Sequence, residues 1–134
     1  PGRQDRVEEI DLASVATPKG GTCGWDECGV FADFNGNGPS SSIRPVLALS
    51  HDDGCCSVIG GLVVRNPKGP ALKGRYIYSD FCNSATRSFK PGFGQVGSVR
   101  SSGISKPSIT SYGENASHKV FATSIDGSVY RLTQ

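Results

Sequence analysis

The chain has 134 residues, enough for one domain or for part of one. Its 14 basic and 12 acidic side chains leave a net charge of +2 without any cluster of Lys and Arg, so its charge indicates neither a nucleic-acid partner nor a membrane-surface partner. Glycine (18), serine (18) and proline (8) are abundant, but 36% of the residues are apolar, which favours a folded core over disorder.

The apolar residues occur in short runs that are separated by Gly, Pro, Asn and Asp. This punctuation is typical of an all-β protein. No run approaches the roughly 18 apolar residues of a membrane-spanning helix. The sequence begins Pro-Gly-Arg, without Met or an apolar leader, so we interpret it as a mature chain or as part of a longer one.

Strands are predicted along the whole chain. The first covers 7–12, and a long loop over 13–44 follows it. Further strands are expected at 45–50, 57–65, 74–82, 85–90, 95–102, 108–113, 119–125 and 128–132. The run at 57–65 is the most apolar and is rich in β-branched residues, so we expect it to be buried, with Gly60-Gly61 marking a bulge or a close backbone approach. Asp126-Gly127 predicts a hairpin turn.

An internal repeat relates residues 57–90 to residues 108–132. Its period of about 50 residues suggests four-stranded antiparallel blades of a β-propeller. Two blades fit into this length, whereas a closed propeller needs at least four. We therefore expect an all-β fold of about two blades of a six-bladed propeller that is incomplete as a single chain. The predicted segments are a partial blade with a long loop at 1–56, a blade at 57–102 and the last blade at 103–134.

Five cysteines favour two disulfides and one thiol in a protein outside the cytosol. Cys23 could pair with Cys28, and Cys82 could pair with Cys55 or Cys56. One alternative is that the cysteines are reduced and buried. The other is a zinc site that uses three cysteines and one histidine, namely Cys23, Cys28, His51 and Cys55.

A calcium-binding pattern occurs within the long loop. Asp33, Asn35 and Asn37 alternate ahead of Gly38, which spells the first half of a loop that offers hard oxygen ligands to a cation. The bidentate acid expected at the twelfth loop position is replaced by Arg44. The alternative is a surface loop rich in Asx and Gly.

Four other features of the sequence can be interpreted in functional or in structural terms. His51 precedes two aspartates and could act as a general base, or it could be a turn histidine in water. Asp80 and Glu114 lie at predicted strand ends, where they could form a site or cap turns. Asn115-Ala-Ser117 is an N-glycosylation sequon if the protein passes through a eukaryotic secretory pathway.

Six motifs in order resemble the C-terminal part of the glucose/sorbosone dehydrogenase family. They are Glu8-Glu9-Ile10-Asp11, Gly20-Gly21-Thr-Cys-Gly24-Trp25, His51 to Arg65, Leu72 to Cys82, Ser111 to Asn115 and Asp126 to Leu132. That family consists of six-bladed quinoprotein propellers and includes aldose sugar dehydrogenases and a hedgehog-interacting-protein-like branch.

The resemblance implies a cofactor and a chemistry. Family enzymes use pyrroloquinoline quinone (PQQ) and calcium to oxidise sugars, with a histidine base from the N-terminal half of the fold. Arg65 matches a family position that contacts the quinone carboxylates. The family's Arg-x-Arg pair at the start of the last blade is missing, because this stretch reads Lys106-Pro-Ser-Ile-Thr110.

The resemblance therefore implies the C-terminal portion of a secreted or periplasmic sugar dehydrogenase-like propeller that is not catalytic alone. No catalytic residue is assigned, Arg65 is the cofactor-binding candidate, and the metal candidates are Asp33, Asn35 and Asn37. The expected partners are the rest of the parent propeller, or other chains that supply blades, including three copies closing one ring. The alternative is a non-catalytic propeller segment that binds a protein or glycan, which the missing Arg-x-Arg pair favours.

Overall fold

The computed structural model describes residues 7–16, 28–29, 32–33, 43–66, 71–94, 96 and 98–133. Within them the fold is all-β, as predicted, and all paired strands are antiparallel. The one helix in these ranges is a short 3₁₀ turn at His51–Asp53, where a turn was expected. None of the described segments forms a helix with the length and apolar character needed to cross a bilayer.

The chain divides into two units. The first comprises residues 1–53 and 92–96, and it contains two small ladders. Strand β1 (Val7–Asp11) pairs with β4 (Pro45–Ser50). The sequence predicted both strands but not their pairing. Strand β2 (Cys28–Gly29) pairs with β3 (Ala32–Asp33), so the prediction of an uninterrupted loop at 13–44 is wrong at this point. Two-residue strands carry too short an apolar pattern to be recognised from sequence.

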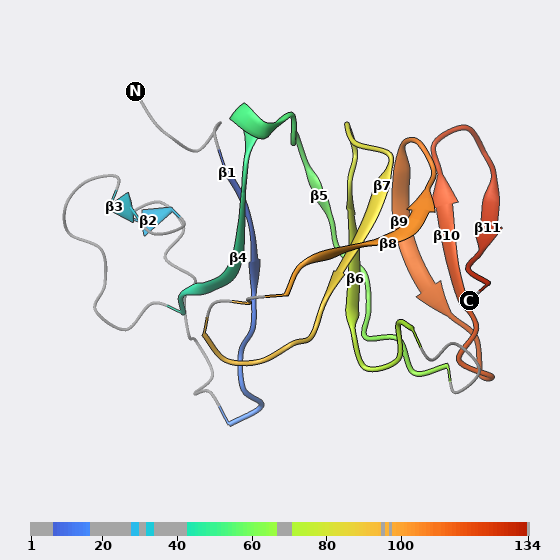
Figure 1. Cartoon of the computed structure of the whole chain (residues 1–134), viewed down its shortest axis with the longest axis horizontal. Coiled ribbons are helices and arrows are strands. Elements are labelled where there is room, and N and C mark those ends of the chain that lie inside the picture. The colour runs from blue at the N-terminus through green and yellow to red at the C-terminus, as the bar shows by residue number, and fades with distance from the viewer. Residues whose placement is uncertain are drawn as a thin grey trace. The chain divides into compact units, whose positions relative to one another are not determined.

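The second unit comprises residues 54–91 and 97–134, and it begins with a four-stranded sheet. Its strands are β5 (Val58–Ile59), β6 (Tyr76–Asp80), β7 (Ala85–Phe89) and β8 (Arg100–Ser105). They are hydrogen-bonded in the order of the sequence, and Figure 1 shows them following one another from green to orange. A meander of four antiparallel strands is the arrangement expected of a propeller blade.

The first strand of this sheet is shorter than predicted. The run at 57–65 contains only the two residues of β5 and an isolated bridge between Val63 and Tyr76. The Tyr76 hydroxyl accepts a hydrogen bond from the Gly61 backbone N–H over 3.0 Å, in place of a ladder partner. The diglycine therefore interrupts the strand. The strand expected at 95–102 lies instead at 100–105.

The second sheet has three described strands, in the order β11-β10-β9. They are β9 (Ile109–Glu114), β10 (Val120–Ser124) and β11 (Val129–Arg131). The predicted hairpin at Asp126-Gly127 is confirmed, since Gly127 adopts a φ of 90° that favours glycine. The Ser128 backbone N–H donates to the Asp126 carboxylate over 2.8 Å and lowers the pKa of Asp126 below its ordinary value.

The internal repeat is visible in the hydrogen bonds of the two sheets. Phe81 follows β6, and its backbone N–H donates to the Ser57 carbonyl over 2.9 Å; Ile125 follows β10 and donates in the same way to Ser108 over 3.1 Å. The turn after each of these strands is closed by a bond back to the last strand residue, over 3.2 Å in the first sheet and 3.0 Å in the second. The strands β6 and β10 therefore hold equivalent places in two copies of one unit.

An apolar core joins the two sheets. Its buried members are Val64, Leu72, Ile77 and Val120. Leu62 and Ile104 from the first sheet region pack against it, as do Tyr112 and Leu132 from the second. Because Ile77 is fully buried and Val120 is 3% exposed, the two middle strands contribute to the same interior.

A buried arginine fastens the segment before β8 to the first sheet. The Arg75 side chain is among the largest fully buried ones in the described chain. It donates to the Ser88 hydroxyl over 2.9 Å and to the backbone carbonyls of Ser88 and Ser98 over 2.8 and 2.7 Å. Burial lowers the pKa of Arg75, and the neighbouring Arg100 adds to the shift.

Gly61 is required by a close backbone approach, as its place in the sequence predicted. A Cβ atom at this position would lie 1.9 Å from the Ile77 carbonyl oxygen, so any side chain would push β6 away. Gly113 in β9 is a matched control, because an added Cβ would meet no atom within 4 Å.

We expect Gly61→Ala to lower the free energy of unfolding by about 3 kcal/mol, at the upper end of the cost of overpacking. Gly113→Ala should leave stability unchanged or raise it by up to about 1 kcal/mol, because alanine restricts the unfolded chain. Urea denaturation followed by circular dichroism measures both values. Equal effects of the two substitutions would contradict the close approach.

Candidate functional site

The proposed cofactor ligand, Arg65, lies in an ion pair. Its Nη2 donates a short hydrogen bond to Oε1 of Glu114, the last residue of β9. The other carboxylate oxygen of Glu114 lies 3.4 Å from Nδ1 of His118 in the β9–β10 turn. The Arg65 side chain is 63% exposed, whereas that of Glu114 is 16% exposed. The carboxylate thus sits between two basic groups at the edge of the second unit.

Arg65 lies beyond the end of β5 and pairs with a carboxylate of the second sheet. An ion pair at this exposure contributes at most about 1 kcal/mol to stability. Its consequence for function is larger, because the guanidinium charge is already compensated by Glu114. The bond to Glu114 uses Nη2 of Arg65 and leaves its Nη1 and Nε donors outside this contact, and the quinone-binding role of Arg65 stays a prediction.

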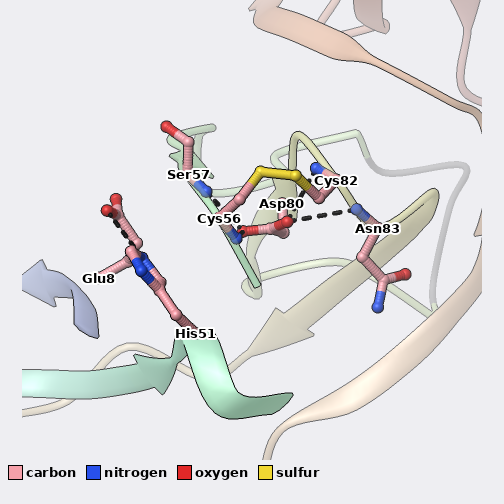
Figure 2. The surroundings of a disulfide bond; sticks show 7 residues. All are labelled: Glu8, His51, Cys56, Ser57, Asp80, Cys82 and Asn83. Carbon is pink, nitrogen blue, oxygen red and sulfur yellow. Dashed lines mark hydrogen bonds and ion pairs between the residues drawn. A yellow bond between two sulfur atoms is a disulfide. The ribbon is translucent and has the colours of Figure 1, made fainter. Parts of the chain in front are cut away.

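Asp80 is the last residue of β6. It is 6% exposed, and its carboxylate accepts four backbone hydrogen bonds. Oδ2 receives the N–H groups of Cys56 and Ser57 over 2.9 and 3.0 Å, and Oδ1 receives those of Cys82 and Asn83 over 2.9 and 3.2 Å (Figure 2). Hydrogen bonds to an ionised carboxylate are stronger than neutral ones. The interpretation of Asp80 as a turn cap is therefore confirmed.

A disulfide between Cys56 and Cys82 spans the same two segments, with 5.7 Å between the Cα atoms (Figure 2). This is one of the two pairings that the sequence left open for Cys82. Cys55 is buried and lies outside this bond. The sulfur atoms of the disulfide lie near the Asp80 carboxylate, but they are bonded to each other and so do not act as thiolate ligands.

The remaining cysteine predictions cannot be placed. Cys23 and the side chain of Cys28 lie outside the described residues, as do Asn35, Asn37 and the side chain of Asp33. The Cys23–Cys28 disulfide, the zinc site and the calcium loop therefore stay predictions.

His51 is held beside a carboxylate of the first unit. Its Nε2 lies 3.4 Å from Oε1 of Glu8 in β1, and both side chains are about one quarter to one third exposed (Figure 2). The interaction joins the 3₁₀ turn to the neighbouring strand. His51 is therefore not a turn histidine that is surrounded by water alone. The contact described for it is with Glu8.

A cluster of hydroxyl groups between the two sheets was missed by the sequence analysis. The Ser79 hydroxyl contacts Thr86 Oγ1 over 3.1 Å and forms a short bond with Tyr112, whose hydroxyl lies 3.0 Å from Thr86. Ser79 and Thr86 are each 1% exposed. The only signal in the sequence was the occurrence of small hydroxyl residues within the predicted strands 74–82 and 85–90.

Each unit has a cavity that is lined by described residues. The cavity in the second unit has about 180 Å³, and Lys106 lies over the Tyr130 ring beside it, 4.8 Å from the ring centroid. It is smaller than the roughly 300 Å³ at which ligand pockets begin. The cavity in the first unit has about 540 Å³ and is lined mainly by apolar residues, with Arg44 as the charged group among its lining residues. Neither lining set contains a paired acid and base.

Comparison with known proteins shows similarity over part of the chain. The chain is 31% identical over 91 residues to the HIPL1 protein of Arabidopsis thaliana, and the match covers 58% of this chain and 12% of that protein. The chain thus spans a small part of the relative. No protein-family model matches, and no solved structure matches. The similarity supports the hedgehog-interacting-protein-like side of the resemblance.

We expect Cys82→Ser to lower the free energy of unfolding by about 3.5 kcal/mol. The disulfide links residues 26 apart in sequence, and without it the unfolded chain regains the entropy of that closed loop. Urea denaturation measures the effect. Dithiothreitol should destabilise the wild-type chain and the control variant Cys55→Ser to a similar extent, and each by about 3.5 kcal/mol more than it destabilises Cys82→Ser, which lacks the Cys56–Cys82 bond. If reduction does not change wild-type stability, the Cys56–Cys82 bond is not the link that holds these segments.

Proposed function

We propose that this chain supplies two neighbouring blades of a larger β-propeller and acts there as a non-catalytic segment that takes part in binding a protein or glycan. The observation that carries this proposal is the repeat of strand order and closing hydrogen bonds in the two sheets of the second unit. Repeats of this kind are stable by stacking on equivalent neighbours. The partial similarity to HIPL1 supports the same reading.

The second sheet is open at its outer edge within the described chain. The first sheet has four strands and the second has three, with β11 at the edge. Exposed apolar side chains lie at this hairpin, since Ile125 is 70% exposed and Val129 is 66% exposed. An unpaired edge of this type is a liability for a protein in water. We assign the missing strand to another part of the complete protein, with further copies of this chain as the alternative.

The non-catalytic character rests on the state of Arg65. Its charge is compensated by Glu114, and the Arg-x-Arg pair of the quinone enzymes is absent from the sequence at 106–110. A binding segment needs no such groups.

The second candidate function is that of a quinoprotein sugar dehydrogenase. The order of six motifs along the chain favours it. Arg65 would then contact the quinone carboxylates, and Asp33, Asn35 and Asn37 would hold calcium. Arg65 would then share its charge between Glu114 and the quinone, and opening the exposed pair costs at most about 1 kcal/mol.

We place the protein outside the cytosol, in a secreted or extracellular location. The Cys56–Cys82 disulfide supports this location, because disulfides persist in oxidising compartments.

Titration with PQQ in the presence of calcium separates the two functions. In the complete protein we expect no saturable change in protein fluorescence and no reduction of a dye acceptor with aldoses. Arg65→Ala should behave as the wild type. Glu114→Gln is the sharper probe, because it releases the Arg65 charge without removing it.

Saturable PQQ binding that is lost in Arg65→Ala, or strengthened tenfold or more in Glu114→Gln, would contradict the non-catalytic proposal. Either result would assign Arg65 to a quinone site that Glu114 partly blocks. A circular dichroism spectrum of each variant establishes that the fold is unchanged.

A further inference from the structure

We propose that Asn115 is an N-glycosylation site and that the β9–β10 turn carries an oligosaccharide. This inference rests on the proposed secretion and adds a covalent modification to it. Asn115-Ala-Ser117 is the only Asn-x-Ser/Thr triplet in the 134-residue sequence. The structure adds three observations to the triplet: its exposure, the orientation of the asparagine amide and the closure of the turn.

The triplet occupies the tip of the hairpin formed by β9 and β10. It begins directly after β9 ends at Glu114, and β10 starts at Val120. Asn115, Ala116 and Ser117 are all exposed. An oligosaccharide at this tip would extend into solvent without displacing either strand, whereas a buried asparagine could not carry one in the folded protein.

The asparagine side chain is oriented by its own turn. Its Oδ1 accepts backbone hydrogen bonds from Ser117 and Lys119, each over 3.0 Å. Only the oxygen of a carboxamide can accept, so these two donors fix Oδ1 toward the turn and leave Nδ2 on the opposite side. Within the described chain, no hydrogen bond involves Nδ2 or the Ser117 hydroxyl. The nucleophilic nitrogen and the serine hydroxyl of the sequon are therefore both accessible.

The turn itself is closed independently of the sequon side chains. The Asn115 backbone N–H donates to the Lys119 carbonyl over 3.1 Å, and the His118 N–H donates to the Asn115 carbonyl over 2.8 Å. The modification would therefore not need the turn to open.

The modification is a glycosyl transfer whose atoms balance. Nδ2 of Asn115 attacks the anomeric carbon of an oligosaccharide that is linked to a lipid pyrophosphate. The new N–C bond forms as the C–O bond to the pyrophosphate breaks, the lipid pyrophosphate leaves, and Nδ2 loses one proton. The donor is supplied by the secretory pathway and not by this chain.

A glycan here also has a consequence for binding. The turn contains His118, which lies beside the Glu114–Arg65 ion pair. An oligosaccharide on Asn115 would keep this end of the second sheet in solvent. A protein partner would then contact other faces of the propeller.

The test is expression of the chain behind a cleavable secretion leader in a eukaryotic cell line. We expect one glycosylated species whose added mass is removed by peptide-N-glycosidase, with conversion of residue 115 to aspartate in the mass spectrum. Chain retained within the secretory pathway counts equally with exported chain, because the transfer precedes export.

Two substitutions of Ser117 are matched. Ser117→Ala removes the hydroxyl that the transferase needs but keeps the backbone N–H that bonds to Asn115, so the turn should persist while the modification is lost. Ser117→Thr keeps the hydroxyl and should retain the modification. Asn115→Gln should also lose it, at the additional cost of the two turn hydrogen bonds.

Wild-type chain that contains the Cys56–Cys82 disulfide but an unmodified Asn115 would overturn the proposal. The disulfide shows that such a chain entered the oxidising compartment. Failure of the glycosylation site is thereby distinguished from failure of the proposed location, which is tested by whether the disulfide is present in protein isolated from its native source.

Discussion

The second unit depends on how its middle strand is fastened to the segment before the first strand. In the first sheet the Asp80 carboxylate binds two backbone N–H groups from Cys56 and Ser57 and two from its own following turn. The Cys56–Cys82 disulfide joins the same segments covalently. A buried carboxylate is tolerated only where it is well hydrogen-bonded, and four donors meet this requirement. The Asp80 hydrogen bonds and the disulfide together thus fix the register of β5, which is only two residues long.

The second sheet uses the same arrangement with weaker chemistry. Ser124 ends β10 at the place where Asp80 ends β6, and its hydroxyl donates to the Pro107 carbonyl over 3.1 Å. The hydroxyl cluster and the shared apolar core then join the two sheets. The sheets are therefore two versions of one unit, one fixed by a carboxylate and a disulfide and the other by a single hydroxyl. This difference agrees with the proposal that the second sheet is completed by contacts from outside the described chain.

Much of the fold could be predicted from sequence because its strands carry local signals. Alternating apolar residues placed β6, β7, β9 and β10 nearly correctly, and Asp126-Gly127 gave the last hairpin. The failures have a physical reason. The strand expected at 57–65 was interrupted by a glycine that bonds to the hydroxyl of Tyr76, a residue distant in sequence. The diglycine predicted a bulge or a close backbone approach, but the local pattern could not identify Tyr76 as the partner.

The candidate site depends even more on contacts between residues that are distant in sequence. The sequence placed Arg65 at the end of a strand over 57–65, but β5 already ends at Ile59. The partner Glu114 belongs to the other sheet and is brought to Arg65 only by the fold. Both candidate partners of Cys82 could be named in advance, but the choice of Cys56 over the buried Cys55 is made only by the fold.

Hydrogen exchange at the outer edge of β11 tests the central claim most directly. Because the Leu132 amide bonds to Val120 in β10, the amides of Val129 and Arg131 point away from that strand. The matching residues of β7 are Thr86 and Ser88, and this strand is covered by β8, where Ser88 pairs with Arg100. We predict fast exchange at Val129 and Arg131 in the isolated chain and slow exchange in the complete protein, with Thr86 and Ser88 slow in both. Protection of the β11 amides in the isolated chain, or their fast exchange in the complete protein, would contradict the account.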